Sequence, residues 1–183
     1  DVQIINEAYV DQLGEMVMQD DRENSVRVYI TGERKIVNRL TSSDIKAVAD
    51  LQQAQSTDTD PVMIPITATC SGILPENIQV SPQNLSVHLE KKVTKEFAIN
   101  VTSDDSKPAQ GLEVASLTAN PEKVRITGPE SLVGKIDSVS VDVSSKLEGI
   151  DQDTTITGAE LTITDKNQDT LSSNSMSYLK FDN

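Results

Sequence analysis

Apolar and polar residues alternate along most of this chain. The alternating positions are rich in β-branched residues and are bounded by Gly, Pro, Asn and Asp, which is typical of half-buried β-strands. The pattern therefore predicts a mainly β protein. The apolar positions fall into seven runs: Val26, Val28 and Ile30; Val62, Ile64 and Ile66; Leu85, Val87 and Leu89; Phe97, Ile99 and Val101; Val124 and Ile126; Val139, Val141 and Val143; Leu161 and Ile163.

Two segments break the alternation and predict short helical turns. In 34–40 (RKIVNRL) and 130–136 (ESLVGKI), apolar residues recur at i, i+1 and i+4. Both follow an ITG tripeptide, so we expect Gly32 and Gly128 to give the backbone freedom to leave a strand, and Pro129 to take the first helical position. The segment 7–20 is compatible with either a helix or an irregular strand.

The chain repeats one order of parts after about one hundred residues. In 23–51 and again in 120–143, an alternating run leads to ITG, then to a short apolar turn, and then to a strand that ends in Asp. A shorter phrase, Pro followed by two polar residues and alternating apolar positions, occurs at 82–89 and 121–128, where Pro suits the start of a strand. An internal repeat predicts two domains, 1–91 and 92–183, joined at the charged step after Glu90.

Composition limits the possible partners. The net charge of −13 is shared by both halves, and no cluster of Lys and Arg with interleaved aromatic residues is present. Such a field repels phosphate backbones and anionic lipid headgroups, so we expect no nucleic acid partner. Only 3% of the residues are aromatic, which disfavours a carbohydrate-binding platform. No apolar run approaches the length that spans a bilayer.

Residues able to support catalysis are scarce. His88, the single histidine, alternates with Val87 and Leu89, which predicts an outward-facing position on a strand. Cys70, the single cysteine, is expected to be a small core or strand-end residue. No GxSxG nucleophile elbow occurs. We therefore expect no enzyme activity, no cofactor and no catalytic site.

Four acidic stretches could offer oxygen ligands to a cation. In the last of them Asp165, Asn167 and Asp169 alternate as at the start of an EF-hand loop, but the glycine and the closing glutamate are missing. A hairpin turn explains this stretch better, and we expect no metal site. Asp50 and Asp142, which recur at the two strand ends, are expected to cap the following turns. The four stretches are 20–24, 56–60, 102–106 and 163–169.

Taken together, these motifs resemble the YbbR domain family. Residues 111–143 (GLEVASLTANPEKVRITGPESLVGKIDSVSVDV) follow its pattern of a Pro-x-x-Val strand ending in Gly, a short apolar turn and a strand ending in Val-Asp. The first half resembles it through VRVYITG, SSDIKAVADL and VSPQNLSVHLE. It departs by lacking Pro before Val26 and by a longer connection, since Gly32 to Asp50 is 18 positions and Gly128 to Asp142 is 14. Loop insertions of this size cost little.

The resemblance implies two tandem β-rich YbbR-like domains with one or two short helices each, similar to the carboxyl-terminal domain of ribosomal protein L25. In bacteria, CdaR-like members of the family carry an amino-terminal transmembrane helix and several extracytoplasmic copies, and they regulate a membrane diadenylate cyclase that makes cyclic di-AMP. The resemblance thus implies a regulatory protein-interaction role on the outer face of the membrane. The sequence begins in strand-like residues, and we expect it to be part of a longer, anchored protein.

The sequence allows two further expectations. Exposed strand edges favour self-association or partner binding by strand addition. The alternative function is a structural, spacer or adhesion module of stacked β domains on the bacterial cell surface.

Overall fold

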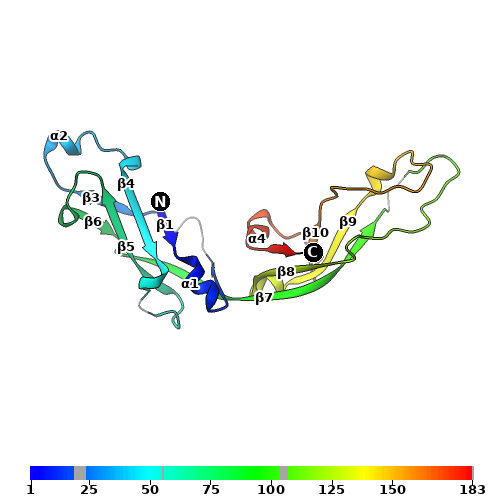
Figure 1. Ribbon diagram of the computed structural model, residues 1–183, viewed down its shortest axis with the longest axis horizontal. Coiled ribbons are helices and arrows are strands. Elements are labelled where there is room, and N and C mark those ends of the chain that lie inside the picture. The colour runs from blue at the N-terminus through cyan, green and yellow to red at the C-terminus, as the bar shows by residue number, and fades with distance from the viewer. Residues whose placement is uncertain (19–23, 55, 104–106, 183) are drawn as a thin grey trace. The chain divides into compact units, whose positions relative to one another are not determined.

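The computed structural model describes residues 1–18, 24–54, 56–103 and 107–182. The chain forms two compact units, Asp1–Lys91 and Lys92–Asn183. The boundary lies within one long strand, β7 (Asn84–Thr102), whose first part belongs to unit 1 and whose second part belongs to unit 2. Strands are the main element of both units, which confirms the predicted mainly β fold (Figure 1).

In the described residues of unit 1 there are seven strands, in whole or in part, and two short α-helices. Its alternation of apolar residues places one side of each strand in the core, and single 3-10 turns connect several of the strands. The elements are β1 Val2–Ile5, α1 Glu7–Gln12, β2 Glu15–Met18, β3 Arg27–Ile30, α2 Arg34–Val37, β4 Ile45–Asp50, β5 Val62–Cys70, β6 Ile78–Ser81 and the first part of β7, with 3-10 turns at Ser42–Asp44, Leu51–Gln53 and Pro75–Asn77.

The central ladder of unit 1 combines a parallel pair with antiparallel pairs. β1 runs parallel to β4, β4 pairs antiparallel with β5, and β5 pairs antiparallel with the first part of β7. β2 pairs antiparallel with β7, and β3 pairs antiparallel with β6. The predicted apolar run on β5 faces the core, since Val62, Ile64 and Ile66 are all buried.

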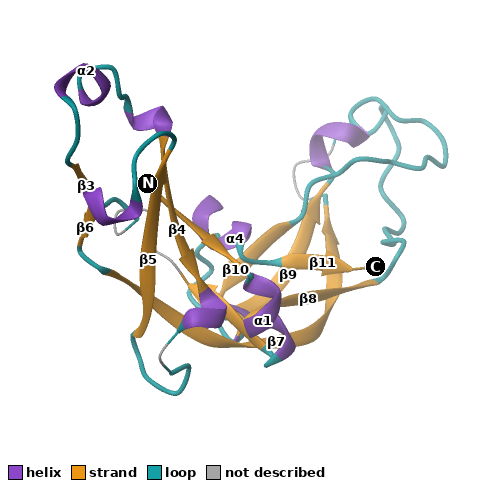
Figure 2. Cartoon of the chain, turned by 60° about the vertical axis from the view of Figure 1, so that its left-hand side comes forward, coloured by secondary structure: helices purple, strands orange, loops and turns teal. Residues whose placement is uncertain are grey.

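Unit 2 contains the second part of β7 and further strands separated by irregular segments. β7 pairs antiparallel with β8 along Lys92–Ala98 and then parallel with β9 along Ile99–Thr102. β9 also pairs with β10, and β8 also pairs with β11. The buried side chains of the unit include Val124, Ile126 and Val139. The elements are β8 Lys123–Pro129, α3 Glu130–Val133, β9 Ile136–Asp142, a 3-10 turn at Ser144–Leu147, β10 Thr162–Asp165, α4 Ser173–Ser177 and β11 Lys180–Asp182 (Figure 2).

The sequence repeat corresponds to a repeated arrangement of strands. In unit 1 the order β1, β4, β5 is a parallel pair followed by an antiparallel pair, and in unit 2 the order β7, β9, β10 is the same. The parallel ladders end at Ile5 with Asp50 and at Thr102 with Asp142. The first ITG segment begins at Ile30, the last residue of β3, and the second lies within β8. β3 and β8 are therefore counterparts.

Three local expectations are refined by the structure. The ambiguous segment contains both a helix, α1, and a strand, β2; its last two residues, 19 and 20, lie outside the described part of the chain. Pro129 does not occupy the first helical position, because it ends β8 and precedes α3, which is Glu130–Val133. Pro82 and Pro121 each precede a strand by two residues, which confirms their predicted place at strand starts.

The expected role of Gly32 and Gly128 was wrong. Neither glycine has a positive φ, so backbone freedom is not what these positions need. At Gly128 the need is space, because a Cβ atom there would lie 2.5 Å from Leu179 Cδ2 and 3.3 Å from the Tyr178 carbonyl oxygen. At Gly32 a Cβ atom would meet Val37 Cγ2 at 3.4 Å, an ordinary contact distance.

Candidate functional site

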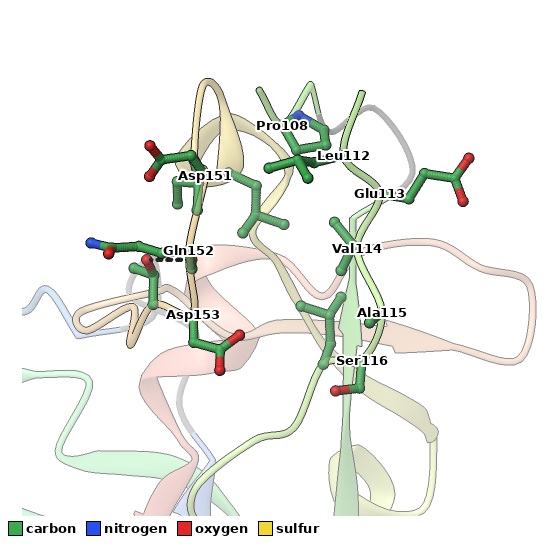
Figure 3. Close-up of a pocket in the computed structure, with 13 residues that line it drawn as sticks. Pro108, Leu112, Glu113, Val114, Ala115, Ser116, Asp151, Gln152 and Asp153 are labelled. Carbon is green, nitrogen blue, oxygen red and sulfur yellow. Dashed lines mark hydrogen bonds between the residues drawn. The ribbon is translucent and has the colours of Figure 1, made fainter. Parts of the chain in front are cut away.

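Unit 2 contains a hollow of about 300 Å³ between two irregular segments (Figure 3). One wall is the stretch 112–117 with Pro108, and the other is 150–154 with Leu147. Two backbone hydrogen bonds join the segments: Ala109 N–H donates to the Ile150 carbonyl at 3.0 Å, and Gly149 N–H donates to the Lys107 carbonyl at 2.8 Å. These two hydrogen bonds connect the irregular segments, which are not paired with each other as β-strands.

The base of the hollow is apolar. Leu147 is buried together with Val141 of β9 and with Val143, which directly follows β9. Val114, Leu117 and Ile150 pack against this cluster and also line the hollow. The hollow is therefore a gap above a small apolar core, and its lining combines apolar residues with polar ones.

The charged residues of the hollow lie on its margin. Glu113 and Asp151 carry exposed side chains that point away from the gap, while the Asp153 side chain lies between the two walls (Figure 3). No Lys, Arg or His lines it. The hollow thus combines an apolar base with carboxylates at its margin, and we take it as a candidate interaction site.

The sequence did not indicate this hollow. Its walls come from segments with apolar residues but without a period of two or of 3.6, so no element could be assigned to them. The one sequence signal for the hollow is the presence of apolar residues in a stretch without a strand pattern. These residues are Leu112, Val114 and Leu117.

Asp50 and Asp142 act as turn caps, as predicted. Asp50 Oδ1 accepts the Gln52 N–H at 3.0 Å, and Asp142 Oδ1 accepts the Ser144 N–H at 2.8 Å and the Ser144 hydroxyl at 2.5 Å. The Ser144 hydroxyl, followed by the Ser144 N–H, lowers the pKa of Asp142 below its usual value of 3.8, because both donors favour the charged carboxylate.

His88 and Cys70 occupy the positions expected for them. His88 faces outward from β7, with its Nδ1 atom 2.5 Å from Asp60 Oδ1, and both side chains are largely exposed. Cys70 is buried at the end of β5. Both residues belong to unit 1, whereas the residues that line the hollow belong to unit 2.

The acidic stretch 163–169 forms the predicted hairpin turn. Asp165 Oδ1 accepts the N–H groups of Asn167 at 2.8 Å and Asp169 at 3.0 Å, and a bridge joins Thr164 to Thr170. In the stretch 56–60, Ser56 Oγ accepts the Asp58 N–H at 3.1 Å. Most of 20–24 and part of 102–106 lie outside the described residues. Within the described part of the chain, no three His, Cys, Asp or Glu side chains are grouped as metal ligands.

The α-helices in the described part of the chain are short. The longest α-helix, α1, has six residues, and none of the helices in the described ranges is long and apolar enough to cross a bilayer.

Comparison with known proteins relates unit 2 to one family. Residues 99–174 match the family model described as YbbR-like protein. Among solved structures, the chain is similar to the crystal structure of a YbbR-like protein from Streptococcus pneumoniae TIGR4, with 18% sequence identity and a TM-score of 0.46, over 98% of this chain and 84% of that chain. The comparison with curated proteins gave no match. The assignment of residues 1–91 as a further copy of the same domain stays a prediction.

Proposed function

Unit 2 carries a YbbR-like domain, and on that premise we propose that this chain is a noncatalytic regulatory region of a membrane-anchored YbbR-domain protein that modulates a membrane diadenylate cyclase. Both units would lie on the extracytoplasmic side, held by a membrane helix outside these 183 residues. The match of residues 99–174 to the YbbR-like family model carries the proposal. The resemblance implies the regulatory role, because CdaR-like members of the family regulate cyclic di-AMP synthesis.

The chemistry of the described residues supports an interaction role. The hollow in unit 2 offers an apolar base and outward carboxylates, which suit contact with a protein surface. The net charge of −13 makes close approach to anionic headgroups or to nucleic acid unfavourable. Protein partners are therefore favoured over a lipid or nucleic acid ligand.

A regulatory effect requires that a partner binds two states of the protein with different affinity. In our proposal, a partner outside the membrane binds the β units, and the anchored helix transmits the difference in orientation to the cyclase. This mechanism requires folded units with a fixed binding surface, and it requires no chemistry from His88 or Cys70.

The proposal is tested by cyclic di-AMP levels in cells that contain the cognate cyclase. Three strains are compared: one with the intact parent protein, one with residues 1–183 deleted but the anchor kept, and one without the protein. A change on deleting the 183 residues supports the proposal and gives the sign of regulation. Equal levels in all three strains would exclude it.

A further inference from the structure

The apolar core below the hollow of unit 2 is less completely covered than the core of unit 1. In unit 1, the buried cluster includes Leu85 and Val87, which both come from the first part of β7. In unit 2, the cluster at the base of the hollow has three buried members and a larger set of half-buried ones. The half-buried members are Ile99, Val101, Val114, Leu117, Ile150, Ile156, Ala159 and Leu161.

In unit 1, the first part of β7 connects two other strands. It pairs antiparallel with β5 along residues 84–87 and then antiparallel with β2 along residues 88–91. Its apolar residues alternate: Leu85 and Val87 are buried, and Leu89 packs half-buried against the same cluster. One strand of eight residues therefore supplies three apolar side chains to the core of unit 1.

The repeat places the counterpart of β2 at one wall of the hollow. The parallel ladders end at Ile5 in unit 1 and at Thr102 in unit 2, so these two residues are equivalent. β2 begins ten positions after Ile5, at Glu15, and ten positions after Thr102 is Leu112, which lines the hollow. The wall 112–117 belongs to no strand, and the Leu112 side chain is 48% exposed.

The counterpart of the first part of β5 also lacks a strand partner among the described residues. Thr67 of β5 and Thr162 of β10 each pair with the residue two positions before the capping aspartate, so they are equivalent. In unit 1, the preceding residue, Ile66, donates its N–H to the Gln83 carbonyl at 2.9 Å and is buried. In unit 2, the preceding residue, Leu161, is half-buried and belongs to no strand.

The register of the repeat indicates where the corresponding strand of unit 2 lies in the sequence. Ile78 of β6 and Phe181 of β11 each lie opposite the isoleucine of an ITG segment, in β3 and β8 respectively. Leu85 follows Ile78 by seven positions, and seven positions after Phe181 is the fifth residue beyond Asn183. The three apolar residues in the first part of β7 thus correspond to the fifth, seventh and ninth residues beyond Asn183.

We propose that the polypeptide continues beyond Asn183 and that this continuation lies along the hollow of unit 2 as an extended strand with apolar residues at its fifth, seventh and ninth positions. The ninth residue lies opposite Val114, as Leu89 lies opposite Val17 in unit 1. The strand runs antiparallel to 112–115, and its apolar side chains cover the half-buried cluster and remove it from water.

The order of elements favours the same polypeptide over a separate protein as the occupant. In unit 1, the strand that closes the core starts at Asn84, only three residues after β6 ends at Ser81. The side chains of Glu113 and Asp151 point away from the gap, so the space above Leu147 is left to apolar groups (Figure 3). The hollow then makes a contact within one chain, and this inference does not depend on the cyclase.

The test extends the chain after Asn183 by SPQNLSVHLEK, the sequence of residues 81–91, which has apolar residues at the fifth, seventh and ninth added positions. Amide exchange at residues 112–115 is followed by NMR. We expect exchange to be slower than in the 183-residue chain by roughly tenfold or more. The matched control carries serine at the three apolar positions of the extension, and should give no protection because buried hydroxyls would lack partners.

The natural continuation is tested in the same way, with the eleven residues that follow Asn183 in the parent protein as the extension. Leu112→Ala, in a side chain that the added strand would cover, provides a second readout. In either extended chain this substitution should reduce the protection by roughly twofold or more, whereas it should change the 183-residue chain little.

Four results would overturn the inference. The first is a parent protein that ends at Asn183 or has polar residues at the fifth, seventh and ninth positions beyond it. The second is unchanged exchange at 112–115 in both extended chains, and the third is equal protection by the serine control. The fourth is protection only in a dimer seen by sedimentation, or only by free SPQNLSVHLEK peptide, which would make a second copy or a separate polypeptide the occupant. These experiments do not measure cyclic di-AMP, so the proposed function is judged separately.

Discussion

Asp50 and Asp142 hold the same position in the two units. Each is the last residue of a strand in a parallel ladder, paired with Ile5 and Thr102 respectively, and each carboxylate accepts the backbone N–H two residues later. Asn6, the residue after β1, also donates from Nδ2 to Asp50 Oδ1 at 2.8 Å. The two units therefore share this hydrogen bond as well as the order of their sequence motifs.

The cap at Asp142 gives a first prediction. Asp142→Ala removes the acceptor for the Ser144 N–H and hydroxyl, so the thermal midpoint of unit 2 should fall. Asp142→Asn keeps a side-chain oxygen and should fall less. Circular dichroism melts of the three proteins compare these effects. Equal melting of the alanine variant and the unchanged chain would contradict the assigned cap.

The lowered pKa of Asp142 gives a second prediction, on pH. A carboxyl group with a pKa lowered by folding stabilises the folded state above its ordinary pKa, here 3.8, and this contribution is lost as the pH falls through the lowered value. Urea unfolding between about pH 6 and pH 2 should show this loss. Asp142→Asn, which does not titrate, should show a weaker dependence on pH in that window. An unchanged dependence would mean that Asp142 has the same pKa folded and unfolded.

The equivalent glycines Gly128 and Gly32 give a third prediction with opposite outcomes. Gly128→Ala places a Cβ against Leu179 and the Tyr178 carbonyl, and should lower the free energy of unfolding by about 1–3 kcal/mol. Gly32→Ala meets only Val37 and Ile73 at ordinary contact distances, and should be neutral or stabilising by about 0.4–1 kcal/mol. Equilibrium unfolding of both variants measures the contrast. A destabilised Gly32→Ala with an unaffected Gly128→Ala would refute the packing explanation.

The base of the hollow gives a fourth prediction. Leu147→Ala deletes a buried side chain that packs with Val141 and Val143, and should cost about 2–5 kcal/mol of unfolding free energy. The loss should also speed exchange of the Ala109 and Gly149 amides, which join the two walls. Leu112→Ala, at a largely exposed side chain on the same hollow, is the control and should change both quantities little.

The sequence predicted local features well where a short pattern determines them. The alternation at Val62, Ile64 and Ile66 marked buried strand positions, and the Asp165 stretch predicted a hairpin turn. The outward position of His88 followed from its neighbours on the same strand. These features depend on residues close together in the chain, so a single sequence is sufficient to infer them.

Features that depend on distant segments could not be obtained in this way. The parallel pairing of β1 with β4 joins residues 45 positions apart, from Val2 to Ala47, and no local pattern specifies it. Gly128 is required because of Leu179, which directly precedes β11 and is brought close to Gly128 by the pairing of β11 with β8. The hollow forms where two aperiodic segments meet above Leu147, so neither segment alone predicts it.

We propose that these β units regulate a diadenylate cyclase through specific contacts. The most direct measurement is the rate of cyclic di-AMP synthesis in membranes that hold the cyclase and the anchored parent protein, with the 183 residues either intact or replaced by an unrelated folded β domain of similar size. We predict that the replacement changes the rate as much as deleting the units does. If the unrelated domain preserves the rate of the intact protein, the units act as a spacer, and the regulatory proposal is contradicted.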